Sequence, residues 1–158
     1  IDSVDYQGKT CLHIAIMNGK YEAVKWLLKH GANVHVRDGL GNNSLMLVIQ
    51  RFYRKLSILQ EAIDMITLIG DTGGRLSDVS LPIELMSFVS EGKLEIIQLI
   101  HQLGGSMICT DSSGKTILHM AVLHNQIDIV RWILSDSSLS NLRTIQDKLH
   151  RTAFDDAK

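Results

Sequence analysis

The chain has 158 residues, of which 45% are hydrophobic and 21% charged, a balance typical of a globular domain rather than a disordered segment. Its formal net charge of −1 provides no overall attraction toward nucleic acid or an anionic membrane surface, so we expect no nucleic-acid partner. Charged residues interrupt the apolar runs before they reach the roughly 18 residues of a membrane span, so we expect no membrane insertion. Cys11 and Cys109 suggest no disulfide framework, which favours a reducing, cytoplasmic (intracellular) location.

One sequence motif, called the phrase below, recurs along the chain. The pattern D-x-x-G-K-T-x-L-H-x-A occurs at residues 5–15 and again at residues 111–121. Asp38 opens a copy 33 residues after Asp5, Asp78 lies 33 residues before Asp111, and Asp147 opens another copy. Self-similarity at a fixed period indicates stacked supersecondary units. We therefore predict a single array of repeats at residues 5–37, 38–77, 78–110 and 111–146, with a partial repeat at 147–158. Because the chain stops inside an expected helix, we expect it to be a fragment of a longer chain.

The first repeat shows the expected elements most clearly. Residues 5–8 carry turn residues, and Thr10 can cap a helix that runs to about residue 18. A second helix is expected at about residues 21–30, and a glycine suited to a helix end follows each helix. Apolar residues at helical spacing give each helix an inward face: Leu12, Ala15, Ile16, Val24, Leu27 and Leu28. Acidic residues recur where each second helix is expected to start, at the end of the helix dipole that favours negative charge: Glu22, Asp64, Glu95 and Asp128.

The second repeat has 40 residues, a surplus of 7 that falls around residues 52–61, between its two helices. Two interpretations are open. The run Arg51, Phe52, Tyr53, Arg54 and Lys55 could form a basic and aromatic ligand patch. Alternatively, the helix pair is lengthened, with Leu56, Ile58 and Leu59 packed inward. We favour the lengthened helix pair, because runs of charge usually lie on solvated faces.

The third and fourth repeats also depart from the pattern. In the third repeat, Leu81, Ile83 and Met86 replace the glycine, threonine and histidine of the phrase, although its helical spacing is kept. The fourth repeat has 3 extra residues, which fall in the polar run at residues 135–140.

No group of residues indicates chemistry. His13 and His119 share a repeat position that Met46, Met86 and Asp155 fill elsewhere, so the repeats have no common ligand set. The sequence GKT at residues 114–116 looks like the end of a phosphate-binding loop, but the glycine that such a loop needs five residues before its last glycine is a cysteine. The sequence DTG at residues 71–73 occurs once, whereas an aspartic protease needs two carboxylates that share a proton. We predict no catalytic, cofactor-binding or metal-binding residues.

A 33-residue unit that carries T-x-L-H-x-A resembles the ankyrin repeat, and the resemblance covers nearly the whole chain. It implies an all-α ankyrin-repeat solenoid of helix-turn-helix units with short β-turn or hairpin fingers, one unit having a lengthened helix pair. It implies that His13 and His119 are buried and hydrogen-bond to the backbone and to the threonine three residues earlier. It also implies a protein–protein interaction module without catalytic activity of its own.

Solenoids of this kind expose a concave surface built from finger tips and first-helix faces, where we expect the protein partner to bind. Carried over to this chain, the predicted protein-binding residues are Tyr6, Gln7, Lys9, Met17, Asn18, Leu40, Asn42, Gln50, Arg51, Ser112, Ser113, Lys115, Leu123 and His124. Tyr6, Met17, Leu40 and Leu123 are the expected anchors, because aromatic and flexible apolar side chains dominate binding hot spots. Tyr6 could equally pack against a neighbouring repeat. We expect Lys115, as a tip residue, to contribute little to stability.

The order of the repeats is also similar to the C-terminal ankyrin region of cytosolic L-asparaginases of the asparaginase/lysophospholipase type. There, too, a regular repeat precedes a stretch like GGRLS at residues 73–77, and a repeat without the turn phrase follows, like residues 85–104. This resemblance implies an alternative function: a C-terminal regulatory or assembly tail of an asparaginase- or glutaminase-like amidohydrolase. Its partner would be an intramolecular catalytic domain, with the active site outside this chain. Cytosolic regions of some potassium channels look similar as well, especially around residues 151–157.

Overall fold

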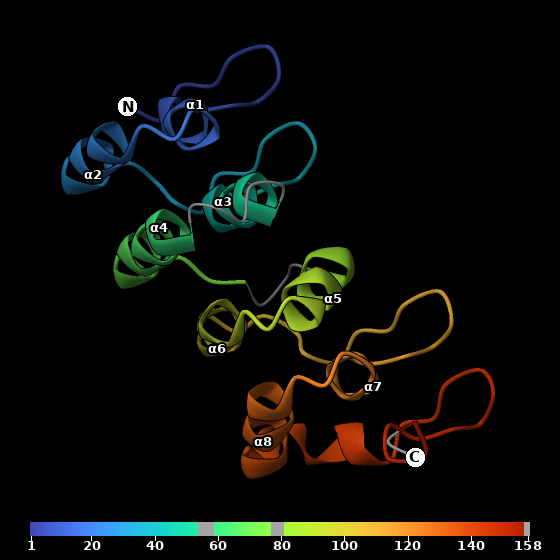
Figure 1. Ribbon diagram of the computed structural model, residues 1–158. Helices are drawn as coiled ribbons and strands as arrows, with labels where there is room; N and C mark the ends of the chain where they lie inside the picture. Colours follow the sequence, from blue (N-terminus) through green and yellow to red (C-terminus); the bar gives the residue numbers. More distant parts are fainter. Residues whose placement is uncertain (54–58, 77–80, 157–158) are drawn as a thin grey trace. The chain divides into compact units, whose positions relative to one another are not determined.

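The computed structural model describes residues 1–53, 59–76 and 81–156, except for the side chain of Leu59. Its helices are α1 (Cys11–Met17), α2 (Tyr21–Lys29), α3 (Ser44–Tyr53), α4 (Leu59–Asp71), α5 (Pro82–Ser90), α6 (Leu94–Gln102), α7 (Ile117–Leu123), α8 (Ile127–Ser135) and the 3-10 helix η2 (Ser137–Arg143). They divide into two compact units, an N-terminal half (Ile1–Ser77) and a C-terminal half (Asp78–Lys158). Each half contains two helix pairs (Figure 1).

The bounds of α1 follow from the residues beside it. Thr10 has an extended backbone, and its hydroxyl accepts a hydrogen bond from the His13 N–H at 3.3 Å. This bond satisfies one of the N–H groups that a helix start leaves unpaired. At the other end, Gly19 has a φ of 64°, and the N–H groups of Gly19 and Lys20 donate to carbonyls of the last turn. A left-handed glycine with these two bonds ends a helix without steric strain. The expected helix pair of the first repeat is confirmed.

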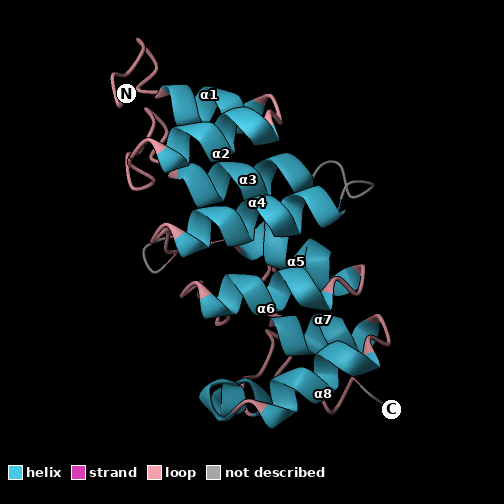
Figure 2. Ribbon diagram, turned by 90° about the vertical axis from the view of Figure 1, so that its left-hand side faces the viewer, coloured by secondary structure: helices cyan, strands magenta, loops and turns pink. Residues whose placement is uncertain are grey.

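In the N-terminal half, α1 packs on α2 and on α3, and α4 packs on α3 and on α2. Figure 2 shows the pair α1–α2 lying along the pair α3–α4. The apolar stripes predicted from helical spacing face these contacts, and the side chains almost fully buried there include Leu12, Ile16, Val24, Leu45, Ile49 and Ile69. Fully burying such a side chain stabilises the fold by roughly 1.5–3 kcal/mol. The core of this half is therefore a layer between stacked helix pairs, as a repeat protein requires.

The C-terminal half repeats this plan. Helix α5 packs on α6 and on α7, α7 packs on α8, and α8 packs on η2. Its fully buried side chains include Leu85, Phe88, Ile97, Leu118 and Ile133. Isolated antiparallel bridges join Thr110 to Thr116 and Gln146 to Thr152, and they close the bases of two short hairpin fingers. The predicted all-α fold, with repeated helix pairs and hairpin fingers, is confirmed.

The lengthened pair of the second repeat is also confirmed. Helices α3 and α4 have 10 and 13 residues, against 7 and 9 in α1 and α2. Phe52 is buried, which counts against an exposed basic and aromatic patch. The rest of the surplus, including Leu56 and Ile58, lies outside the described residues. Because α4 starts at Leu59, Asp64 lies beyond its first turn and Glu61 takes the place at the helix start, so the prediction for Asp64 was wrong.

The two other departures have local causes. Helix α5 starts at Pro82, two positions earlier in the repeat than α1 and α7, and Leu81 provides no side-chain cap. A proline in the first turn needs no N–H partner, so it can open a helix where the capping threonine is missing. The polar run at residues 135–140 is largely helical rather than a loop, since η2 begins at Ser137 and buries Leu139 and Leu142 against its neighbours.

Candidate protein-binding surface

Each finger is the turn that precedes the first helix of a repeat, and an aspartate at its first position holds it in shape. In each of four described fingers, the carboxylate of the leading aspartate accepts hydrogen bonds from the N–H groups two and four residues later, at 2.8 to 3.0 Å. These aspartates are Asp5, Asp38, Asp111 and Asp147. An aspartate that bonds to its own downstream backbone fixes a turn without any help from packing. The counterpart in the third repeat, Asp78, lies outside the described residues.

Neighbouring fingers are joined by a backbone hydrogen bond at equivalent positions in both halves. The N–H of Gly39 donates to the Gln7 carbonyl at 2.7 Å, and the N–H of Lys148 donates to the Ser113 carbonyl at 3.0 Å. Gly8 must be a glycine here, because its φ is 72° and a Cβ would stand 2.8 Å from the Gly39 nitrogen. In each half, the fingers therefore form a short fixed row (Figure 1).

Two buried histidines, His13 and His119, each attach a finger to the helix that follows it. The Nδ1 atom of His119 accepts hydrogen bonds from the Thr116 N–H at 3.1 Å and from the Thr116 hydroxyl at 2.9 Å. Its Nε2–H donates to the Arg151 carbonyl in the next finger at 3.0 Å. His13 bonds in the same way to the Thr10 N–H and to the Val36 carbonyl, both at 3.1 Å. The structural role that the ankyrin resemblance implies for these histidines is confirmed.

Asp155 at the histidine position of the fifth repeat now has an explanation. Its carboxylate accepts hydrogen bonds from the Thr152 N–H and hydroxyl at 2.9 and 2.8 Å, which are the bonds that Nδ1 accepts in His119. A carboxylate can replace an imidazole acceptor, but it cannot donate onward to another repeat. Sequence reasoning missed this equivalence, although the spacing Thr-x-x-Asp is visible in the sequence.

The burial of His13 leads to a prediction for the pH dependence of stability. Burial lowers the pKa of His13 below its usual value of about 6.5, and both ring nitrogens are already used in the neutral form. As the pH falls through about 6.5, the unfolded chain takes up a proton that the folded chain resists, so stability falls. We expect the urea midpoint to be lower at about pH 5 than at about pH 7.5. A His13→Met variant with the same pH-dependent change in midpoint would contradict this assignment.

The predicted anchors of the N-terminal half are strongly exposed. Tyr6 is 94% exposed and Leu40 is 85% exposed. They stand on neighbouring fingers beside a groove of about 460 Å³ that also involves Lys9 and Asp38. Met17, at the end of α1, is exposed as well. The fingers thus place two large side chains at the edge of one groove.

Three other predicted residues of this half are used internally. Asn42 is only 7% exposed, and its side chain bonds to Asp38 and Gln50 within the second repeat. The Arg51 guanidinium donates to the Met17 carbonyl at the end of α1, where a cation is favoured by the helix dipole. We therefore leave Asn42 and Arg51 out of the proposed surface, since Asn42 is buried and the Arg51 guanidinium is bound to the end of α1.

Lys115 is not the isolated tip residue that we expected. Its side chain is 15% exposed, and its ammonium lies 2.6 Å from Asp156 and 3.4 Å from Asp147. Arg151 pairs with the same two carboxylates, at 3.1 Å each. A hydrogen bond from the backbone N–H of Arg151 holds the pKa of Asp147 well below its usual range, and the bond to Asp156 raises the pKa of Lys115. This ionic cluster connects the fourth finger to the fifth repeat, so loss of Lys115 affects an internal contact.

The other predicted residues of the C-terminal half lie at the surface. Ser112 and Ser113, at the finger tip, and Leu123 and His124, at the end of α7, are all exposed. Leu149 stands on the next finger at the repeat position of Gln7 and is 69% exposed. The row in this half therefore also carries an exposed apolar side chain.

One cluster that sequence reasoning missed contains a serine, a histidine and an aspartate. His101 Nε2 lies 3.1 Å from Asp136 Oδ2, and Ser138 donates to Asp136 at 2.6 Å. A hydrolase triad requires the serine and the carboxylate on opposite ring nitrogens, whereas Ser138 also approaches Nε2, at 3.4 Å. The cluster therefore holds η2 against α6. Within residues 1–53, 59–76 and 81–156, no group of three or more His, Cys, Asp or Glu residues could hold a metal ion.

Over the same part of the chain, the helices are too short and too polar for any of them to cross a bilayer.

Stacked helix pairs with aspartate-held fingers define a helical repeat protein, a class that binds other proteins through its surface. The chain matches the family model "Ankyrin repeat" over residues 7–39 and the model "Ankyrin repeats (many copies)" over residues 85–134. The chain belongs to the ankyrin-repeat family and is a protein–protein interaction module.

The chain is similar to parts of several larger proteins. It is 29% identical over 139 residues to the potassium channel AKT2/3 of Arabidopsis thaliana, and the matched region covers 87% of this chain and 16% of the channel. It is 32% identical over 133 residues to L-asparaginase of Dirofilaria immitis, which covers 83% of this chain and 21% of that protein. It is 32% identical over 131 residues to the nuclear factor NF-kappa-B p105 subunit of Gallus gallus, which covers 80% of this chain and 12% of that protein. The chain thus spans about a fifth or less of the length of these relatives.

Proposed function

We propose that this module binds its protein partner through the finger tips and adjoining first-helix ends, on the concave face of the array. The surface comprises Tyr6, Gln7, Met17, Asn18, Leu40, Ser112, Ser113, Leu123 and His124, with the half-buried Lys9, Gln50 and Lys115 at its less exposed margin. The observation that carries the proposal is the exposure of Tyr6 and Leu40 beside one groove. Large apolar side chains fixed on a rigid turn bind with little loss of conformational entropy, which makes them effective anchors.

The proposal includes three statements about the chain itself. It has no catalytic activity of its own, because its histidines, aspartates and lysine at the finger bases are used in structural hydrogen bonds and ion pairs. It does not bind nucleic acid, because its net charge is −1 and such binding depends on neutralising phosphates. It acts in the cytoplasm, because Cys11 and Cys109 are both free thiols and such thiols persist in a reducing compartment.

The proposed surface can be tested with a photo-crosslinking amino acid placed at position 6, and at position 25 as a matched control. Tyr6 and Lys25 are both exposed in the N-terminal half, but Lys25 lies within α2, a second helix that carries none of the proposed surface residues. We expect crosslinks from position 6 in cells to one defined polypeptide, and fewer of them when Leu40→Ala is added. Crosslinks of equal yield to the same polypeptide from position 25 would place the partner elsewhere and overturn the proposal.

A second candidate function is favoured by the 32% identity to L-asparaginase of Dirofilaria immitis. In this reading, the chain is the regulatory or assembly tail of an amidohydrolase, and its partner is a catalytic domain on the same polypeptide. The same experiment separates the two functions. Crosslinked peptides from an amidohydrolase domain of the same polypeptide would favour the tail, whereas peptides from a different protein would favour an adaptor.

A further inference from the structure

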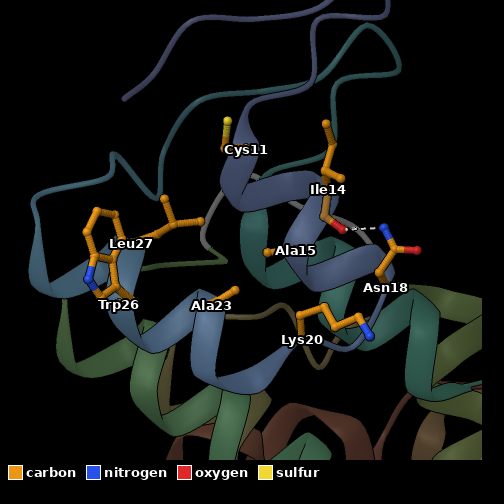
Figure 3. Close-up of a pocket in the computed structure, with 8 residues that line it drawn as sticks. All are labelled: Cys11, Ile14, Ala15, Asn18, Lys20, Ala23, Trp26 and Leu27. Carbon is orange, nitrogen blue, oxygen red and sulfur yellow. Dashed lines mark hydrogen bonds between the residues drawn. The ribbon is translucent and has the colours of Figure 1, made fainter.

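Within the described residues, nothing covers one apolar face of the N-terminal half. Helices α1 and α2 enclose a groove of about 530 Å³ lined by Cys11, Ile14, Ala23, Trp26 and Leu27, with Lys20 at its edge. Figure 3 shows that Cys11 and Ile14 project from α1 on this side, and Trp26 and Leu27 from α2. Trp26 is 57% exposed and Ile14 is 43% exposed. A contiguous exposed apolar face of this kind usually marks a contact with another protein surface.

The same repeat positions are covered elsewhere in this molecule. Cys11 corresponds to Ser44 in α3 and to Ile117 in α7, and both of these side chains are completely buried. Ala23 corresponds to Ile129 in α8, which is likewise buried. Helix α1 packs on α3, and α5 packs on α7, so in both cases the positions are buried in a helix pair that has another pair stacked on it. Cys11 and Ala23 are exposed, because the described chain provides no helix pair that stacks on them.

Tryptophan occupies one of these positions twice. Trp132 in α8 stands at the repeat position of Trp26, and its ring lies edge-on to His101 of α6, with 5.7 Å between ring centroids. It thus packs on the outer helix of the pair before it. Trp26 instead stacks on His30 of its own helix, with 3.8 Å between ring centroids. The same residue type at the same position therefore meets a preceding outer helix in one repeat and remains 57% exposed in the other.

Lys20 provides an independent argument. It stands at the repeat position of Gln126, whose amide donates to the Ser90 carbonyl at the C-terminal end of α5, at 2.9 Å. A lysine at this position can donate in the same way, and its charge is favoured at the C-terminal end of a helix.

We propose that the α1–α2 face seats one further ankyrin-type helix pair of the same polypeptide, joined through residues 1–4. These residues align with residues 34–37, the linker that leads from α2 into the next finger. Asp2 is already fixed to the first repeat, because the Asn33 N–H donates to its carboxylate at 2.9 Å. The Lys20 ammonium donates to the last carbonyls of the first helix of the added pair, and Trp26 packs on its second helix.

The test extends the 158-residue chain at Ile1 with a copy of residues 78–106, which keeps the repeat register. The readout is alkylation of Cys11. Cys109 does not interfere, because it is buried and its thiol pKa is raised by burial to about 11. We expect alkylation of Cys11 to slow by on the order of tenfold or more in the extended chain, since it then requires local opening. Trp26→Ala or Lys20→Ala in the extended chain should restore part of the rate, whereas the matched exposed change Ile127→Ala should not.

Three results would overturn the proposal. The first is unchanged alkylation of Cys11 in an extended chain whose circular dichroism shows that the added helices have formed. The second is protection of Cys11 in the unextended chain that rises with concentration together with dimer formation, which would assign the face to a second copy. The third is protection that survives both Trp26→Ala and Lys20→Ala.

Discussion

Replacing Leu118 with alanine is expected to lower the free energy of unfolding by about 2–5 kcal/mol, the range for large-to-small changes in a packed core. Leu118 lies in α7 and is completely buried. Its side chain fills the layer between helix pairs of the C-terminal half, so its removal leaves a cavity as well as a loss of buried apolar area. Urea or guanidinium unfolding, followed by circular dichroism, measures the loss.

Leu149→Ala is the matched control for this prediction. It makes the same chemical change at a finger tip where the side chain is 69% exposed, and exposed substitutions usually change stability by about 0.5 kcal/mol or less. Equal losses in the two variants would show that our assignment of inward and outward positions is wrong. Lys115→Ala is unsuitable as a control, because Lys115 belongs to the ionic cluster with Asp147 and Asp156.

Replacing His119 with methionine is expected to cost roughly 1–3 kcal/mol, because the change leaves the buried Thr116 N–H without an acceptor. The Arg151 carbonyl loses the hydrogen bond from His119 but keeps the one from the Asp147 N–H at 2.8 Å. Methionine is the residue that Met46 and Met86 provide at this position in other repeats, so gross misfolding is not expected. Denaturant unfolding gives the total loss.

Hydrogen exchange locates the effect of the same variant. We expect faster exchange at Thr116 and in the finger at residues 147–151, because the histidine joins that finger to α7. His124→Met, an exposed change at the end of the same helix, is the control and should leave both regions unchanged. Faster exchange spread evenly over α7 and α8 would instead indicate a packing role for His119.

The sequence predicted most of the local structure, because the relevant interactions lie within a few residues of one another. The turn at Asp5, the cap at Thr10 and the helix end at Gly19 each depend on bonds spanning at most five residues. The predictions failed where the chain departs from the phrase. The start of α4, and with it the position of Asp64, is set by the length of the insertion and not by a local signal. For the same reason, the sequence did not indicate that residues 137–143 form a helix.

The same distinction between local and tertiary interactions applies to the candidate surface. Which residues stand at finger tips follows from repeat register, and so Tyr6 and Leu40 could be named from the sequence. Whether a tip residue is free depends on which other side chains the fold brings into contact with it. Asn42 is enclosed by Asp38 and Gln50, and Lys115 is drawn to Asp156, which lies 41 residues away in the chain.

The sequence by itself therefore determined the family, the repeat register and the absence of a recognisable catalytic motif, because short-range turn chemistry and helical periodicity are written into each repeat. Only the tertiary structure decided which side chains are occupied and which are exposed. Burial and ion pairing depend on contacts between repeats, and no repeat contains the information about what is stacked against it. Trp26 and Trp132 show this directly, since the same residue at the same repeat position is open in one helix pair and packed against His101 in the other.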